Sequence, residues 1–202
     1  MRLFRPHLLS FLCYHEAFFR IKTSRKVLFL TFDDGPDPES TPVILDILDK
    51  MHVKAVFFCN GNVAEMYPEL IEKIRQRGHM TGNHGYYHLN GWKTAYKDYL
   101  HNTEKADATT SDKLFRPPYG KITYRQYRDL KKRYKIIFWD LMAYDFDRSF
   151  GPDRSAEVLK KKIRPGSIIV LHDSPRSNCR CYLEEFIRDS VNRGYIFNLP
   201  DG

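Results

Sequence analysis

Short apolar runs alternate along this chain with longer segments in which apolar residues recur at helical spacing. The run from Val27 to Phe32 is almost wholly apolar, as is typical of a strand buried on both faces. Further strands are predicted at 55–59, 80–81, 114–115, 135–139, 167–171 and 195–197. Between the strands, helices are predicted to begin at Thr41 and Pro68 and to cover 92–108, 124–132, 155–162 and 183–191.

The alternation of strands and helices is typical of an α/β fold with a mainly parallel sheet. A standard eight-unit barrel needs about 250 residues, and the whole chain has only 202. We therefore predict a distorted or incomplete (β/α) barrel with mainly parallel strands, and keep an open doubly wound sheet as the alternative. Residues 25–202 are expected to form this single domain, preceded by residues 1–24 as an N-terminal lead-in segment.

The lead-in segment gives mixed signals about the compartment. Arg2 and Arg5 precede an apolar run at 8–14 that resembles a short signal core, but His15 and Glu16 interrupt it. No small-residue cleavage site follows, and the run is too short to span a bilayer. We therefore expect no clear cleavable signal peptide, and a protein that is either cytoplasmic or associated with the cell envelope.

The formal net charge of +8 makes the surface basic. Scattered lysines and arginines mainly give solubility, and they also suit peripheral contact with a membrane face or an anionic envelope polymer. No reader helix or zinc-finger spacing accompanies the charge, so nucleic acid is not an expected partner. The four cysteines, of which Cys59 is expected to be a buried thiol, lack the Cys-x2-Cys spacing, and no disulfide framework is predicted.

Two adjacent acids, Asp33 and Asp34, stand at the end of the first strand. Adjacent side chains of a regular strand point to opposite faces, so two neighbouring carboxylates share one site only if the backbone turns. Gly35-Pro36 provides such a turn. One acid can then bind a metal ion while the other takes a proton, and this division of labour suggests hydrolysis.

Other polar residues follow later strands at the corresponding end. They are His84 and His88 after the third extended piece, Arg116 and Tyr119 after the fourth strand, Asp145 a few residues past Trp139, and His172 directly after Leu171. Catalytic groups gather at the carboxyl ends of parallel strands. We therefore expect these residues, although far apart in sequence, to converge on one rim.

His84 and His88 have the His-x3-His spacing, which can clasp one metal ion on a helix or in a tight loop. With Asp34 they supply two imidazoles and one carboxylate, the ligand set of a catalytic zinc site with an open position. On their own the two histidines would more often be surface residues of a loop. The acidic pair on the same predicted rim favours the metal site.

The remaining rim residues suit supporting roles. Arg116 is expected to pair with Asp33 and to keep it ionised and oriented, although by itself an ordinary salt bridge is the commoner outcome. The backbone N–H of Tyr119 can face a developing oxyanion, unless this residue is simply a packed aromatic. His172 suits a proton donor whose pKa Asp145 would raise, whereas a lone histidine at a strand end is usually structural.

Together these residues resemble the motifs of the polysaccharide deacetylases of the NodB-homology type, carbohydrate esterase family 4. Five motifs stand in the family's order between about residue 26 and residue 198. They are Thr31-Phe32-Asp33-Asp34-Gly35-Pro36, His84-x3-His88, Arg116-Pro117-Pro118-Tyr119, the acid Asp145, and Leu171-His172. The set is highly specific, although the fourth motif alone would be weak.

The resemblance implies the fold, the activity and the role of each residue. It implies a distorted (β/α) barrel that hydrolyses N-acetyl, or O-acetyl, groups on a polysaccharide or oligosaccharide such as a chitin-like or peptidoglycan glycan. It implies a divalent metal, usually zinc and otherwise cobalt or a similar ion, held by Asp34, His84 and His88. The implied catalytic residues are Asp33 as base, Arg116, Asp145 and His172 as acid, and the implied oxyanion and substrate residues are Tyr119, Pro118, Phe146 and Leu171.

Two positions depart from the family pattern. Gly85 stands where serine or threonine is usual, and loss of the hydroxyl that braces the histidine loop can weaken metal binding about tenfold or more. Phe146 stands where tryptophan is common, which would reshape the wall of the pocket. Neither change removes a ligand or a proton-transfer group, so we predict an active enzyme. A catalytically impaired carbohydrate-binding homologue is the alternative.

Overall fold

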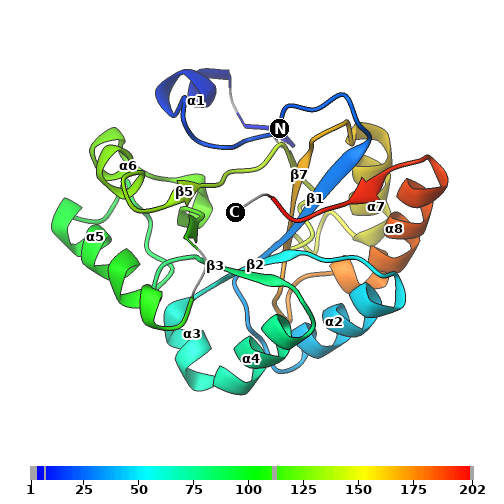
Figure 1. Cartoon of the computed structure of the whole chain (residues 1–202), viewed down its shortest axis with the longest axis horizontal. Helices are drawn as coiled ribbons and strands as arrows, with labels where there is room; N and C mark the ends of the chain where they lie inside the picture. The colour runs from blue at the N-terminus through cyan, green and yellow to red at the C-terminus, as the bar shows by residue number, and fades with distance from the viewer. Residues whose placement is uncertain (1–3, 7, 111–112, 201–202) are drawn as a thin grey trace.

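A curled sheet of parallel strands forms the centre of the molecule, and helices pack along its outer side (Figure 1). The computed structural model describes residues 4–6, 8–110 and 113–200. The strand order is β5-β4-β3-β2-β1-β7-β6, and β8 pairs with the start of β1. The strands are β1 (Val27–Asp33), β2 (Val56–Cys59), β3 (Met80–Asn83), β4 (Leu114–Phe115), β5 (Lys135–Ile136), β6 (Leu141–Met142), β7 (Ile168–His172) and β8 (Ile196–Phe197).

The helices connect successive strands, as expected for a distorted (β/α) barrel. They are α1 (Leu8–Cys13), α2 (Ser40–Lys50), α3 (Gly61–Met66), α4 (Pro68–Gln76), α5 (Tyr96–Lys105), α6 (Tyr124–Leu130), α7 (Pro152–Lys162) and α8 (Leu183–Asn192). The main core lies between the central strands and the helices α2, α7 and α8.

The central strand β1 is buried along its whole length. A strand covered on both faces must be apolar almost throughout, and Thr31 is the one polar residue before Asp33. The parallel register pairs Asp33 of β1 with His172 of β7. In the same way it pairs Asn83, just before His84, with Phe115, just before Arg116. The sheet thus delivers the acids, the histidines and the arginine to the same end.

Most of the predicted elements are present, with differences at their ends. The helix predicted over 92–108 begins only at Tyr96, because Asn90 holds the preceding residues in a turn by accepting hydrogen bonds from them. The strand predicted over 135–139 ends at Ile136. The short elements α1, α3 and β6 were not predicted, since two to six residues leave little periodicity to detect.

The sheet remains open between its edge strands β5 and β6, since no ladder joins them in the part of the chain that the structure describes. The N-terminal residues fill this gap. The N–H of Phe18 donates to the Ile136 carbonyl (2.9 Å), and the Phe18 carbonyl accepts from the N–H of Phe138 (2.8 Å). On the other side, the N–H of Met142 donates to the carbonyl of Phe4 (2.9 Å). We refer to residues 4–20, apart from residue 7, as the seam segment.

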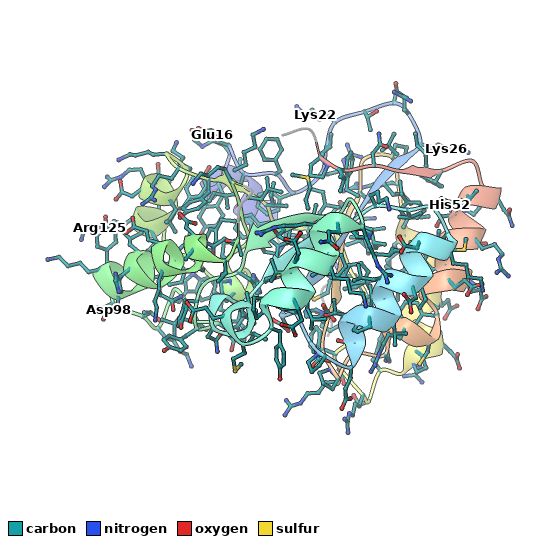
Figure 2. All side chains as sticks on the ribbon, turned by 60° about the horizontal axis from the view of Figure 1, so that its bottom comes forward. Glu16, Lys22, Lys26, His52, Asp98 and Arg125 are labelled. Atoms are coloured by element: carbon teal, nitrogen blue, oxygen red, sulfur yellow. The ribbon has the colours of Figure 1, made fainter. Side chains whose placement is uncertain are left out.

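Charged side chains project from the outer surface of the molecule, as Figure 2 shows for Lys22, Lys26 and Arg125. No helix among the described residues has the length and apolar character needed to cross a bilayer. The four cysteines are free, and Cys59 is buried. Burial raises the pKa of the Cys59 thiol, so this cysteine is inert in the core.

Candidate active site

The end of β1 presents two consecutive carboxylates to one cavity. Asp33 is the last residue of the strand and is almost completely buried. Asp34 leaves the extended conformation with a φ of 79°, which breaks the alternation of side chains along the strand. The side chain of Asn60 holds this turn by donating from Nδ2 to the Asp34 carbonyl (2.9 Å). Both carboxylates therefore line the same cavity.

Asp34, His84 and His88 form a compact cluster of possible metal ligands. One donor atom from each residue lies within 4.8 Å of the other two. Asp34 Oδ1 lies 3.3 Å from His88 Nε2 and 3.7 Å from His84 Nε2. The two histidines stand in the loop that follows β3, so the His-x3-His spacing works here without a helix.

The two histidines of this cluster are held in the form that binds a metal ion. Burial lowers the pKa of His84 to about 3, and the charge of His88 acts in the same direction. Burial also lowers the pKa of His88, although Asp34 opposes the shift. The Nδ1–H of His84 donates to the Arg116 carbonyl (2.8 Å), which leaves Nε2 as the free nitrogen. Neutral imidazoles beside a carboxylate fit a divalent cation.

Asparagine side chains brace the histidine loop at the departure from the family pattern. Gly85 has a φ of +79°, a conformation that favours glycine. Its N–H donates to Asn83 Oδ1 (2.7 Å), and the N–H of Tyr87 donates to Asn102 Oδ1 (2.8 Å). A Cβ atom at position 85 would lie 2.9 Å from Asn102 Nδ2. The loop is therefore fixed without the expected hydroxyl group.

Arg116 is fully buried and holds Asp33 in place. Its Nη1 donates to Asp33 Oδ1 (2.6 Å) and to Thr31 Oγ1 (2.7 Å). Its Nε and Nη2 donate to the backbone carbonyls of Ile137 (3.2 Å) and Phe138 (2.9 Å). A buried cation with this many acceptors has a fixed orientation. The second oxygen of Asp33 lies 4.0 Å from the Nε2 of His84, beside the metal cluster.

His172 and Asp145 form a second pair on the rim. Asp145 Oδ1 lies 2.9 Å from His172 Nδ1, and Asp145 Oδ2 accepts from the His172 N–H (2.7 Å) and from Ser177 Oγ (2.6 Å). Burial alone would lower the pKa of His172, but the charge and the hydrogen bond of Asp145 outweigh it and raise the pKa to about 9. Ser177, which sequence reasoning missed, fixes the carboxylate from the other side.

The predicted substrate residues divide into two groups. Tyr119 and Phe146 are exposed and line the cavity; the ring of Tyr119 packs against His88, and the ring of Phe146 packs against His172, with centroids 4.4 Å and 4.8 Å apart. Pro118 and Leu171 are buried and do not line the cavity. The side chain of Leu171 packs in the main core, and its contact with substrate stays a prediction, as does that of Pro118.

The cavity has a volume of about 950 Å³ and contains aromatic residues that the motifs did not indicate. Among them are Trp92, Trp139 and Tyr144, and Arg176 adds a positive charge. Their positions in loops between strands leave no periodic signal in the sequence. The arrangement places a carboxylate with a fixed partner, a cluster of metal ligands and a protonated histidine around one open space.

Comparison with known proteins identifies a consistent set of relatives. The family model described as polysaccharide deacetylase matches residues 20–136. A peptidoglycan-N-acetylglucosamine deacetylase of Bacillus cereus is 37% identical over 153 residues, covering 72% of this chain and 55% of that protein. The peptidoglycan-N-acetylmuramic acid deacetylase PdaA of Bacillus subtilis is 30% identical over 197 residues, covering 93% of this chain and 74% of that protein.

Solved structures give the same result. The crystal structure of a peptidoglycan N-acetylglucosamine deacetylase has a TM-score of 0.85 at 30% identity, covering 95% of this chain and 94% of that chain. A pseudoenzyme of carbohydrate esterase family 4 from Bacillus anthracis has a TM-score of 0.78 at 26% identity, covering 89% of this chain and 65% of that chain. The same fold therefore occurs in proteins described as enzymes and in one described as a pseudoenzyme.

Proposed function

This chain belongs to the polysaccharide deacetylase family, and from this membership we propose its activity. The protein is a metal-dependent hydrolase that removes N-acetyl, or O-acetyl, groups from a polysaccharide or oligosaccharide. The observation that carries the proposal is the position of Asp33, fixed by Arg116 and directly beside the cluster of Asp34, His84 and His88.

Asp34, His84 and His88 would hold the metal ion. Two neutral imidazoles and one carboxylate are the donors of catalytic zinc sites, so zinc is the ion that we propose, and cobalt suits the same donors. When bound, a divalent metal supplies a Lewis acid that polarises the acetyl carbonyl and acidifies the attacking water.

Asp33 would act as the general base. Arg116 occupies one of its oxygens, and the other faces the metal cluster, where it can take a proton from the attacking water. The fixed hydrogen bonds of Arg116 keep this oxygen in position through the reaction. The backbone N–H of Tyr119 would donate to the oxyanion that develops on the acetyl group.

His172 would act as the general acid. Because its pKa is about 9, the imidazole carries its proton at neutral pH. It can then donate that proton to the departing sugar nitrogen, and Asp145 stabilises the cation. Phe146 packs against the ring and keeps its orientation.

Among acetylated glycans, we propose a peptidoglycan strand rather than a chitin-like one. Arg176 and Lys121 line the cavity, and neither has a carboxylate partner among the described residues. Peptidoglycan carries carboxylate groups on its lactyl and peptide substituents, whereas chitin has none. This charge complementarity, together with the relatives that act on peptidoglycan, also favours a place in the cell envelope.

Replacing Asp33 by asparagine tests the proposal. Asparagine keeps the shape and can still contact Arg116, but it cannot take a proton. We expect acetate release from acetylated glycan oligomers to fall by about 10²–10⁴-fold, with the metal content unchanged. Asp46→Asn is the matched control, since Asp46 is an exposed acid on α2.

Metal content and acetate release of the wild-type protein, measured in the same assays, separate the enzyme from an impaired carbohydrate-binding homologue. If the wild-type protein purifies without a divalent ion and releases no acetate after zinc or cobalt is added, the impaired homologue is the correct description. If Asp33→Asn retains the wild-type rate, Asp33 is not the base.

A further inference from the structure

A second cavity opens at the end of the sheet away from the catalytic residues. Its volume is about 400 Å³, and Arg20, Lys22 and Arg164 line it. Arg20 pairs with Ser167 at the entry to β7, whereas His172 of the catalytic cavity ends that strand. A rise of about 3.3 Å per residue places Ser167 and His172 about 16 Å apart along the strand. We refer to this second cavity as the basal pocket.

The seam segment forms one wall of the basal pocket. Tyr14 and Phe19 line both cavities, and the buried ring of Phe19 stacks on Phe138, with centroids 4.6 Å apart. Just after this stacked ring, the N–H of Ile21 donates to the Gly166 carbonyl (3.0 Å). The backbone that carries the basic residues is therefore held in place before any ligand binds.

Positive charge exceeds negative charge in the basal pocket. Arg164 Nε donates to the buried carboxylate of Asp140 (3.1 Å), and Arg5 contacts the same carboxylate. Burial would raise the pKa of Asp140, but hydrogen bonds, chiefly from Arg164 and Arg5, outweigh it and lower the pKa. Two guanidinium groups around one carboxylate leave one net positive charge. Arg20 and Lys22 add two more, and neither has an ion-pair partner among the residues that the structure describes.

The basic residues continue along the chain towards β1. Residues 17–26 contain two arginines and two lysines and no acid. Figure 2 shows Lys22 and Lys26 projecting from the same side of the molecule. Glu16, the acid that precedes this stretch, already contacts Lys131 and His15. The basal pocket is thus part of a larger basic surface.

An exposed aromatic ring lies next to these charges. Phe18 is 40% exposed, Phe19 is buried, and Arg20 is exposed again. This alternation directs Phe18 and Arg20 outwards from the same stretch of backbone. A small soluble anion gains little from such a ring. At a bilayer surface, in contrast, an aromatic ring enters the interfacial layer while basic side chains bind the headgroups.

We propose that the basal pocket and Phe18 bind the surface of an anionic phospholipid bilayer, with the phosphate of one headgroup seated between Arg20, Lys22 and Arg164. Guanidinium and ammonium groups form charge-assisted hydrogen bonds with phosphate oxygens. A volume of about 400 Å³ lies within the range of small-molecule sites and suits one headgroup. The catalytic residues then lie at the end of the sheet that is farther from the bilayer.

Removal of the two unpaired charges tests the proposal. The wild-type protein should sediment with phosphatidylcholine vesicles that contain phosphatidylglycerol, and not with vesicles of phosphatidylcholine alone. The Arg20→Gln, Lys22→Gln double variant should bind the anionic vesicles about fivefold more weakly for each charge removed. Arg164 is kept, because its loss would take a partner from buried Asp140. An unchanged Tm checks that the double variant is folded.

A Lys97→Gln, Arg125→Gln double variant is the matched control. It lowers the net charge by the same amount, and both residues are exposed, on α5 and α6. Figure 2 shows Arg125 far from Lys22. Charges beyond the screening length contribute little, so we expect its vesicle binding to change less than about twofold.

Two further measurements separate a bilayer from a soluble anion. Phe18→Ser keeps every charge and should still weaken vesicle binding by about threefold or more, because apolar area is lost. Phosphate should release the wild-type protein from the vesicles more effectively than chloride at the same ionic strength, since phosphate competes for the basal pocket.

Three results would contradict the proposal. Equal losses in the basal variant and its control would mean that net charge alone attracts the protein. Absence of sedimentation with anionic vesicles would overturn the bilayer site, and binding of inorganic phosphate in calorimetry would then assign the pocket to a soluble ligand. Vesicle binding that Phe18→Ser leaves unchanged would remove the ring from the site. Because vesicle binding needs no turnover, failure of this site and failure of the proposed deacetylase activity are seen separately.

Discussion

His84 is buried and His172 is partly buried at the same end of the sheet, and removal from water lowers the pKa of each, yet their final values are about 3 and about 9. The partner of Nδ1 accounts for the difference. His84 donates to a neutral backbone carbonyl and lies beside another histidine, whereas His172 faces the carboxylate of Asp145. One cavity can therefore hold a neutral metal ligand and a protonated acid of the same residue type.

Of the changes considered for the two histidines, removal of the neutral one should have the largest effect on metal binding and activity. His84→Ala deletes one of three metal ligands, so we expect metal affinity to fall at least about a hundredfold and acetate release to be lost. Metal content after dialysis and titration calorimetry with zinc provide the measurement. His101→Ala, on the exposed side of α5, should retain both properties. Retention of the metal by His84→Ala would mean that the ligands have been misassigned.

Asp145→Asn should bring the pKa of His172 closer to that of His84. Without the carboxylate, the effect of burial is opposed only by the charges of Asp34 and Asp33, so the pKa of His172 should fall from about 9. The protonated form is the acid, and activity is therefore lost as the pH rises through that pKa. The alkaline limb of kcat/KM should move to lower pH, and the rate at pH 8 should fall by about 10²-fold or more.

A pH–rate profile checks the change at Asp145, with Ser177→Ala as the milder variant. Ser177 only orients the carboxylate, so its loss should move the limb in the same direction by a smaller amount. An alkaline limb that stays in place in Asp145→Asn would exclude His172 as the acid.

The smallest effect concerns the loop that carries the neutral histidines. Gly85→Ser restores the residue type usual in the family, but the positive φ costs about 1–2 kcal/mol and the new Cβ crowds Asn102. We expect lower stability and no gain in metal affinity, measured by urea unfolding and calorimetry. Gly194→Ser has a similar φ with only the Lys26 side chain at 3.9 Å from the Cβ, and so gives the backbone cost alone. Tighter metal binding in Gly85→Ser would show that the asparagines do not replace the hydroxyl.

The sequence predicted the fold class and several site residues that the structure brings to one cavity. Asp33, His84 and His172 could be predicted because each stands at the end of a strand or directly after it, and a parallel sheet places those positions side by side. The supporting residues could not be found in this way. Asn102, Ser177 and the seam segment act through contacts between distant parts of the chain, such as the bond from Tyr14 to Ile122, 108 residues apart.

The buried guanidinium of Arg116 links two parts of the molecule that perform different tasks. Its Nη2 donates to the carbonyl of Phe138, whose own N–H donates to Phe18 in the seam segment, and its Nη1 donates to Asp33. A short relay of hydrogen bonds therefore runs from the N-terminal residues to the carboxylate of Asp33, whose other oxygen would receive the proton. A protein shortened to begin at residue 20, where the match to the family model begins, would lose this relay at its first link, and it would misalign its base even with every catalytic side chain present.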